Sequence, residues 1–307
     1  MDLDWRLRLA AFAALDRLCR QGDGVVSGGQ LADGFEFEGE RIRLFDVRRG
    51  IWRPRQLGRD GAALTIVTTP PKPGKKPPYD DQIASDDKSF LYRYEGTDPH
   101  YWTNVAIRTA MHEQRPLIYL YGVVPNLYEP IFPCYVIGDD PVALGFRIVA
   151  DAATARIGPD VSMESELTAP RREYATAAVK VRLHQRRFRS LVLSAYRNRC
   201  TICRLTHSVL LDAAHILPDR DERGRPDVSN GLSLCKIHHA AYDANIMGVD
   251  PACVVHVRQE VLDEHDGPML RHGLQEMQGT RILLPRSAVQ RPRQEYLEER
   301  YERFRAA

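Results

Sequence analysis

A metal-ligand pattern near the C-terminus constrains this chain more than any other feature of its sequence. Cys200 and Cys203 form a Cys-x-x-Cys pair, and Cys235 and His238 repeat the same spacing, with 31 residues between Cys203 and Cys235. Structural zinc takes four thiolate or imidazole ligands in a closed tetrahedron, and these four residues supply that set. We therefore predict a structural zinc site. The alternative is a lone Cys-x-x-Cys, with Cys235 in the core and His238 on the surface.

The same stretch holds polar residues that a zinc site does not need. His215 ends an apolar run, Asn230 precedes a glycine, and His239 and Asp243 follow the second ligand pair. Each has an ordinary explanation when taken alone: a structural histidine, a turn or helix cap, or a helix-surface residue. Together, behind a Cys-x-x-Cys pair, they suggest an enzyme rather than a zinc knuckle.

The length of the chain predicts two domains. The 307 residues are enough for two cores, and the 43% hydrophobic content fits a globular protein. We place the linker near 152–170, which gives domains 1–165 and 166–307.

The sequence has no run of about 18 apolar residues, so we expect no membrane span. The N-terminal segment predicts an amphipathic helix rather than a signal peptide. Six cysteines without an export signal favour metal binding over disulfides, and we expect a cytoplasmic protein.

Basic residues are concentrated directly before the first cysteine pair. The segment 180–199 has seven basic residues and no acid. Such a stripe suits a phosphate backbone, although a solvated helix face is the common alternative. The residues that we expect to bind DNA are Lys180, Arg182, Arg186, Arg187, Arg189 and Arg197.

Hydrophobic periodicity predicts an α+β chain. Alternating or β-branched runs predict strands at 63–69, 89–96, 116–124, 132–140 and 145–150, with helices near 1–21 and 104–113. The second half predicts a basic helix at about 171–198, strands at 210–216 and 252–262, and a surface helix at 292–304.

The segments DAAHILPD (212–219) and NGLSLCKIHHAAYD (230–243) resemble the motif of the HNH (ββα-metal) endonucleases. The resemblance covers roughly 185–250. It implies that His215 is the general base that takes a proton from the attacking water, a role that suits imidazole near neutral pH. It further implies that Asn230 bonds the backbone around that base. His239 would bind a catalytic divalent ion, with Mg²⁺ expected, and Asp243 would help to hold His239.

The chain departs from the family pattern beside the general base. Many members have an acidic metal ligand immediately before the base, whereas this chain has Ala214 there and Asp212 as the nearest acid. Successive strand residues alternate between faces, so Asp212 need not point the same way as His215. We list Asp212 as a second ligand of the catalytic ion.

The front half resembles a different family. The residues that carry the likeness are Tyr79-Asp80-Asp81, the run FLYRYEGT at 90–97 and Asn104-Val105-Ala106-Ile107. They are similar to the SRA (YDG-type) domain, a PUA-like β-barrel that reads 5-methylcytosine or 5-hydroxymethylcytosine by flipping the base. A flipped base needs aromatic faces and polar groups for its edge. The expected pocket residues are therefore Tyr79, Asp80, Asp81, Tyr92 and Tyr94. The alternative is that Tyr92 and Tyr94 belong to the core and Asp80-Asp81 to a turn.

Together, these features predict a modification-dependent endonuclease of double-stranded DNA, similar to type IV restriction endonucleases. The predicted fold is a PUA/SRA-like β-barrel followed by a ββα-metal HNH domain with a structural zinc. Three alternatives stay open: an HNH nuclease that reads unmodified DNA or another mark, a non-catalytic zinc-stabilised DNA-binding protein, and an RNA-binding PUA-like front module. Cutting both strands with one active site per chain requires a homodimer or two visits.

Overall fold

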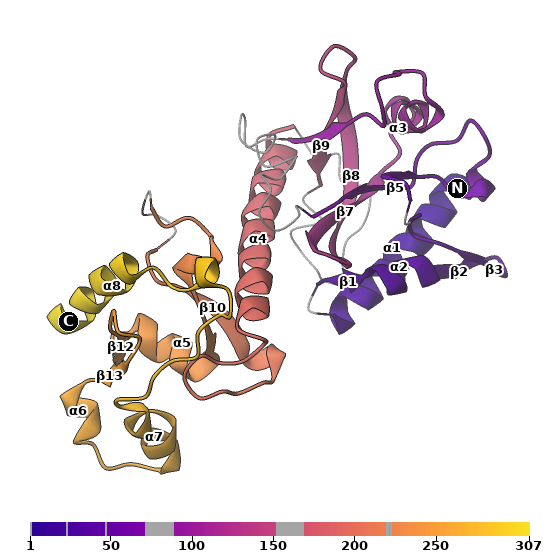
Figure 1. Ribbon diagram of the computed structural model, residues 1–307. Coiled ribbons are helices and arrows are strands. Elements are labelled where there is room, and N and C mark those ends of the chain that lie inside the picture. The colour runs from indigo at the N-terminus through magenta and orange to yellow at the C-terminus, as the bar shows by residue number, and fades with distance from the viewer. Residues whose placement is uncertain are drawn as a thin grey trace. The chain divides into compact units, whose positions relative to one another are not determined.

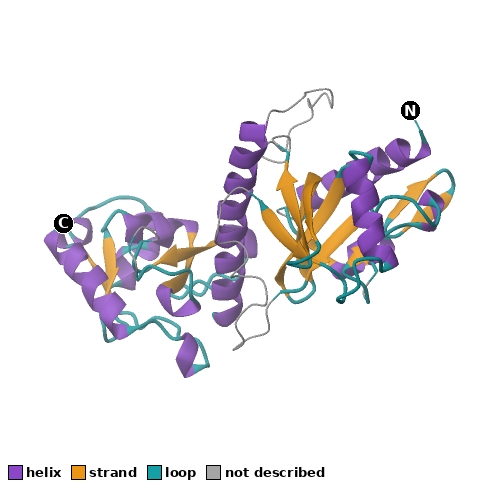
Figure 2. Ribbon diagram, turned by 90° about the horizontal axis from the view of Figure 1, so that it is seen from above, coloured by secondary structure: helices purple, strands orange, loops and turns teal. Residues whose placement is uncertain are grey.

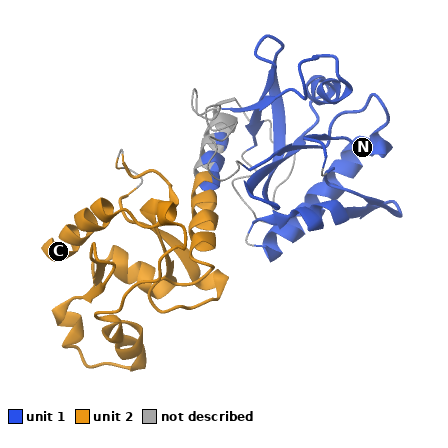
Figure 3. Cartoon of the chain, viewed as in Figure 1, with its two compact units in different colours: residues 1–183 blue, residues 184–307 orange. Residues whose placement is uncertain are grey.

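The computed structural model describes residues 2–22, 24–46, 48–70, 89–151, 169–218, 221 and 223–307. The chain divides into two compact units, Met1–Leu183 and His184–Ala307 (Figure 3). Within the described ranges, no helix is long and apolar enough to cross a membrane. The linker that we expected near 152–170 lies almost wholly outside the described residues.

A curled, open β-sheet forms the centre of unit 1 (Figures 1 and 2). Among the strands of this sheet that the structure describes, β5 and β7 are parallel neighbours and the other pairs are antiparallel. In the part of the chain that the structure describes, the outer strands β4 and β6 do not pair with each other. The α+β class is therefore confirmed, and the predicted barrel is a half-barrel sheet. The strands follow the order β4 (Ile51–Trp52), β5 (Thr65–Thr68), β7 (Leu117–Val124), β8 (Leu127–Asp140), β9 (Gly145–Ala150) and β6 (Phe90–Arg93), with β1 (Val26–Ser27) beside β8.

The continuous apolar run of β7 is explained by burial on both faces of the sheet. Ile118 and Leu120 pack in one cluster with residues of α1 (Leu3–Gln21), whereas Tyr119 and Tyr121 pack on the other side with residues of α3 (Trp102–His112). Side chains alternate along a strand, so a strand covered on both faces needs apolar residues at every position. The remaining elements of unit 1 are α2 (Gly28–Asp33), β2 (Phe35–Phe37), β3 (Glu40–Ile42) and the 3₁₀ turn η1 (Arg55–Leu57).

Unit 2 begins within the long helix α4 (Ala169–Ala195), which confirms the predicted basic helix. The backbone of Arg197 and Asn198 then has positive φ angles of 57° and 50°, and the helix ends there. A hairpin of β10 (Leu211–His215) and β11 (Gly231–Cys235) leads into α5 (Lys236–Asp243), which makes a ββα unit. The shorter turns around this hairpin are η4 (Ser208–Leu210) and η5 (Val228–Asn230).

The predicted strand at 252–262 is wrong over its second half. The strand β13 is confined to Val255–Val257, and α6 (Gln259–Leu262) follows it. Its partner β12 (Met247–Val249) is equally short, and Arg258 N makes its hydrogen bond to Ile246 O, just before β12 begins. The strand stops because its partner ends. The rest of unit 2 consists of α7 (Pro268–Gly273), η6 (Gln275–Met277), η7 (Ala288–Gln290) and α8 (Gln294–Ala306).

Candidate active site and zinc centre

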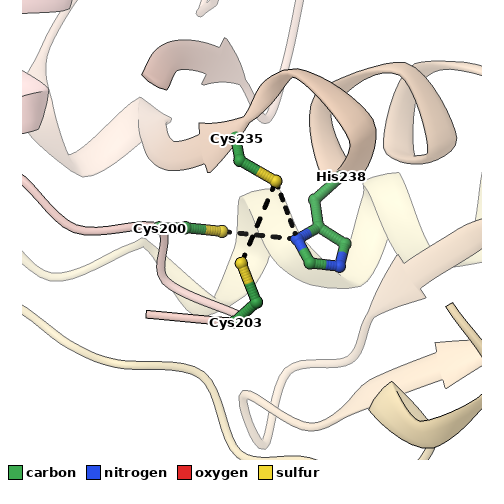
Figure 4. Close-up of side chains that lie close together, drawn as sticks. All are labelled: Cys200, Cys203, Cys235 and His238. Carbon is green, nitrogen blue, oxygen red and sulfur yellow. Dashed lines mark hydrogen bonds between the residues drawn. The ribbon is translucent and has the colours of Figure 1, made fainter. Parts of the chain in front are cut away.

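Cys200, Cys203, Cys235 and His238 converge in unit 2 (Figure 4). One ligand atom from each residue lies within 4.8 Å of the others. His238 Nδ1 is 3.4 Å from Cys200 Sγ and 3.2 Å from Cys235 Sγ, and the Sγ atoms of Cys203 and Cys235 are 3.9 Å apart. Three thiols and one imidazole in a compact group are the donor set of a structural zinc site, so the cluster indicates zinc.

Local backbone structure presents these four ligands. Cys200 and Cys203 lie in a tight turn after α4, where Cys200 N donates to Leu205 O and Arg204 N donates to Cys200 O. Cys235 ends β11, and His238 lies in the first turn of α5. Hydrogen bonds with Cys203 and Cys235 lower the pKa of the Cys200 thiol, whereas the contacts with Cys200 and Cys235 raise the pKa of the Cys203 thiol. Cys200 is therefore the thiol that the cluster holds most readily as a thiolate.

The imidazole of His238 is oriented by α7. Its Nε2 lies 2.8 Å from Gly273 O, and a carbonyl oxygen only accepts hydrogen bonds. Nε2 therefore carries the proton, and Nδ1 faces the thiols as a ligand. This is the usual way in which a neighbouring carbonyl fixes the tautomer of a ligating histidine.

A cavity of about 480 Å³ contains the histidine predicted as general base and the helix residues predicted near the catalytic ion. The residues that line it are His215, Ile216, Pro218, His239, Asp243, Asn245, Arg300 and Arg303. His215 comes from the end of β10, His239 and Asp243 come from one face of α5, and the arginines come from α8. The ββα unit thus brings the two histidines to the same cavity.

Packing against α4 fixes the position of His215. Its ring stacks on Phe188 with a centroid separation of 4.0 Å and an angle of 17°. Gly231 pairs with His215 across the hairpin. A Cβ atom on Gly231 would lie 2.4 Å from Val192 Cγ2 and 2.9 Å from Phe188 Cζ. Glycine at this position therefore allows α4 to approach closely enough for Phe188 to contact His215.

Asn230 holds the segment that follows His215. Its side chain is 1% exposed. Oδ1 accepts from Leu217 N at 2.9 Å, and Nδ2 donates to Leu217 O at 3.1 Å and to Arg225 O at 3.2 Å. The backbone O of Asn230 also accepts from Ile216 N at 2.9 Å. Asn230 thus positions backbone on both sides of the loop and does not itself line the cavity with His215.

Two carboxylates flank the ring of His239. Asp243 Oδ2 is 3.3 Å from Nε2, and Asp212 Oδ2 is 3.6 Å from Nδ1. Asp212 also makes ion pairs with Lys236 at 2.6 Å and Arg189 at 3.5 Å. Burial raises the pKa of Asp212, but Lys236 and the other cations outweigh it, and the net pKa is lowered. Asp243 lines the cavity with His215, whereas Asp212 is occupied by cations on the other side of the His239 ring.

Two arginines of α8 line the cavity, and the sequence interpretation missed them. Arg300 is buried, and its guanidinium donates to Tyr242 O and Asn245 Oδ1 and lies over the Tyr242 ring. Arg303 is half exposed and pairs with Glu299. The buried stripe of α8 consists of Tyr296, Leu297, Arg300 and Phe304. A charged residue within that helical stripe was the signal available in the sequence.

The basic residues predicted to bind DNA on α4 are used largely within the protein. Lys180 is 4% exposed over the Phe90 ring, and Arg182 pairs with the buried Glu129 at 2.8 Å. Arg189 donates to Ser208 O and Leu211 O. Arg186 and Arg187 also have partners in the chain, and Arg197 is exposed after the end of α4.

Of the five residues predicted to form the base pocket, the structure describes Tyr92 and Tyr94. Tyr79, Asp80 and Asp81 lie outside the described residues. Tyr92 and Tyr94 are each 7% exposed in the core of unit 1. The Tyr92 hydroxyl donates to Gly50 O at 2.7 Å, and the Tyr94 hydroxyl bonds Asp139. Tyr94 also packs on Phe146, with centroids 4.6 Å apart. In this arrangement both tyrosines are core residues.

Comparison with known proteins gives a family for residues 200–250. Residues 200–250 match the family model described as HNH endonuclease. The chain thus carries an HNH endonuclease domain, and enzymes of that family hydrolyse phosphodiester bonds. No curated protein matches the chain. A solved structure of "Modification dependent TagI restriction endonuclease" is similar over 84% of this chain and 86% of that chain, at 14% identity and a TM-score of 0.29.

Proposed function

We propose that unit 2 cleaves double-stranded DNA, with His215 as general base and with His239 and Asp243 as ligands of a catalytic divalent ion. The observation that carries the proposal is the shared cavity, which these three side chains line together with Arg300 and Arg303. The match of 200–250 to the HNH endonuclease family supports the reaction class.

The chemistry follows from the positions of the side chains. His215 takes a proton from a water molecule, whose oxygen forms a new bond to phosphorus while the bond to the leaving oxygen breaks. An ion at His239 and Asp243, with Mg²⁺ expected, would stabilise charge on the phosphate and on the leaving oxygen. The imidazole and carboxylate oxygen present there suit such an ion. Phe188 and Asn230 keep His215 and its loop in place.

This proposal changes the roles expected of the two carboxylates. Asp243 borders the cavity and faces His239 Nε2, so we assign it as the ligand. Asp212 stays on the Nδ1 side with Lys236 and Arg189, and it orients the ring. Mn²⁺ binding measured by calorimetry tests the assignment. Asp243→Asn should abolish Mn²⁺ binding. Asp212→Asn should weaken it about tenfold, because it removes a group that orients a ligand rather than the ligand itself. The reverse order would restore Asp212 as the ligand.

For unit 1, the proposed function is recognition of 5-methylcytosine or 5-hydroxymethylcytosine by a PUA/SRA-like domain. The support is the sequence resemblance within about 45–140 and a half-barrel sheet that is compatible with it. A restriction role against modified foreign DNA would follow from this pairing of units. Tyr92 and Tyr94 pack in the core of unit 1, and their part in a base pocket stays a prediction.

Recognition of the modified base is tested with three duplexes that differ only in carrying cytosine, 5-methylcytosine or 5-hydroxymethylcytosine. Cleavage restricted to the modified duplexes would support the assignment. Equal cleavage of all three would leave a nuclease that reads plain DNA. Failure to cut with any divalent ion would favour the non-catalytic, zinc-stabilised DNA-binding protein.

A further inference from the structure

A second cavity, of about 270 Å³, lies beside the candidate active site. The described residues that line it are Arg223, Arg225, Asp227, Ser229, Asn230, Arg293 and Tyr296. Its connection to the active site is direct, because Ile216 N bonds Asn230 O and Ile216 lines the cavity of His215. Three arginines and one aspartate line the cavity. Arg223 also pairs with Asp221 and Glu299, and Arg293 lies 3.7 Å from Glu295.

The arginines are held in place by groups that leave their charge accessible. Arg293 N donates to Ser229 O, and its guanidinium lies over the Tyr296 ring at 5.1 Å, with Nη1 3.1 Å from the hydroxyl. Arg223 pairs with Glu299 at 2.6 Å, and the side chains of Arg223 and Arg293 are 57% and 50% exposed. Exposed ion pairs contribute little free energy, so an anion can compete for these groups.

Asn230 couples this cavity to the general base. The same amide that bonds Leu217 also donates to Arg225 O at 3.2 Å. The backbone that carries Arg225 is therefore fixed relative to the segment after His215. A cationic site built in this way is positioned before any ligand arrives, which lowers the cost of binding.

We propose that this cavity binds a DNA backbone phosphate that flanks the scissile phosphate. The proposal rests on the proposed function for its substrate. Planar guanidinium groups match phosphate oxygens in pairs, which is the chemistry that a backbone contact needs.

Glu299 lies between the two cavities. It pairs with Arg223 of this cavity and with Arg303 of the active-site cavity. The arginines of the two cavities thus connect the 223–230 loop with α8.

Binding of a labelled duplex without added divalent ion tests the proposal without any cleavage, and no chelator is used because it would remove the zinc. Arg225→Ala and Arg293→Ala should each weaken binding about tenfold and reduce the slope of log affinity against log salt by about one. Arg293→Lys keeps the positive charge, so it should retain the salt slope but recover only part of the affinity, because the paired guanidinium contact is lost. The control is Arg305→Ala, which removes an exposed charge from the last turn of α8.

The outcomes separate this inference from the proposed function. Affinities of Arg225→Ala and Arg293→Ala equal to that of Arg305→Ala would overturn the phosphate site even if the wild-type protein cuts DNA. A selective loss of affinity would support the site even if no cleavage is found. With Mg²⁺, the two variants should raise KM and leave kcat nearly unchanged, since a flanking contact binds substrate and transition state alike. A fall in kcat alone, or a wild-type protein that does not bind DNA, would also overturn it.

Discussion

Replacing Asn230 with alanine should destabilise unit 2 and leave unit 1 intact. The substitution removes three hydrogen bonds, to Leu217 N, Leu217 O and Arg225 O, at a side chain that is 1% exposed. A buried hydrogen bond contributes about 1 kcal/mol net, so the free energy of unfolding of unit 2 should fall by about 3 kcal/mol. With a urea dependence of about 2 kcal/mol/M, the midpoint of unit 2 should fall by about 1.5 M.

The composition of the chain allows the two units to be followed separately. All three tryptophans, Trp5, Trp52 and Trp102, lie in unit 1, and the zinc ligands lie in unit 2. Tryptophan fluorescence therefore reports unit 1, and zinc release to a coloured chelator reports unit 2. Gln294→Ala, at an exposed position of α8, provides the control. A fall of less than about 0.3 M in the zinc-release midpoint, or an equal fall in the fluorescence and zinc-release midpoints, would refute the reasoning.

Three further predictions concern packing, metal and pH. Gly231→Ala should cost about 1–3 kcal/mol and lower kcat more than DNA affinity, because the added Cβ displaces Phe188 from under His215; an unchanged kcat would contradict this. Removal of zinc by a chelator should unfold unit 2 and abolish cleavage while the tryptophan spectrum of unit 1 stays the same, and a loss of both signals would count against independent units. Burial and Asp139 raise the pKa of Tyr94, so its stabilisation is present below the ordinary value of 10.0 and is lost as pH rises through the folded pKa. Unit 1 of the wild-type protein should therefore lose more stability than Tyr94→Phe as pH rises above 10.0, and equal losses would exclude this role.

The zinc centre was predictable from the sequence because its ligands come in two local pairs. Cys200 and Cys203 share one turn, and Cys235 and His238 share the start of one helix, so spacing alone indicates the geometry. The helix α4 was predictable for the same reason, from local periodicity. The partners of its basic side chains were not predictable from the sequence. Arg182 bonds Glu129, 53 residues away, and such a pairing depends on how the chain packs.

The contribution of α8 to the cavity shows a second limit. Arg300 and Arg303 reach the cavity because α8 packs beside β12 and α5, far from both in sequence. The sequence predicted a charged surface helix at 292–304, whose charge pattern fits a solvated face. For Tyr92 and Tyr94, the i and i+2 spacing placed both on one sheet face, but whether that face is core or pocket depends on the strands opposite.

The central claim is tested most directly by cleavage of one duplex, in Mg²⁺, by the wild-type protein and by His215→Ala. Because His215 packs on Phe188 at the edge of the cavity, the variant should keep its zinc and its DNA affinity. The account predicts a loss of cleavage of about 10²–10⁴-fold, the contribution of a positioned general base. Wild-type cleavage rates in His215→Ala would contradict it.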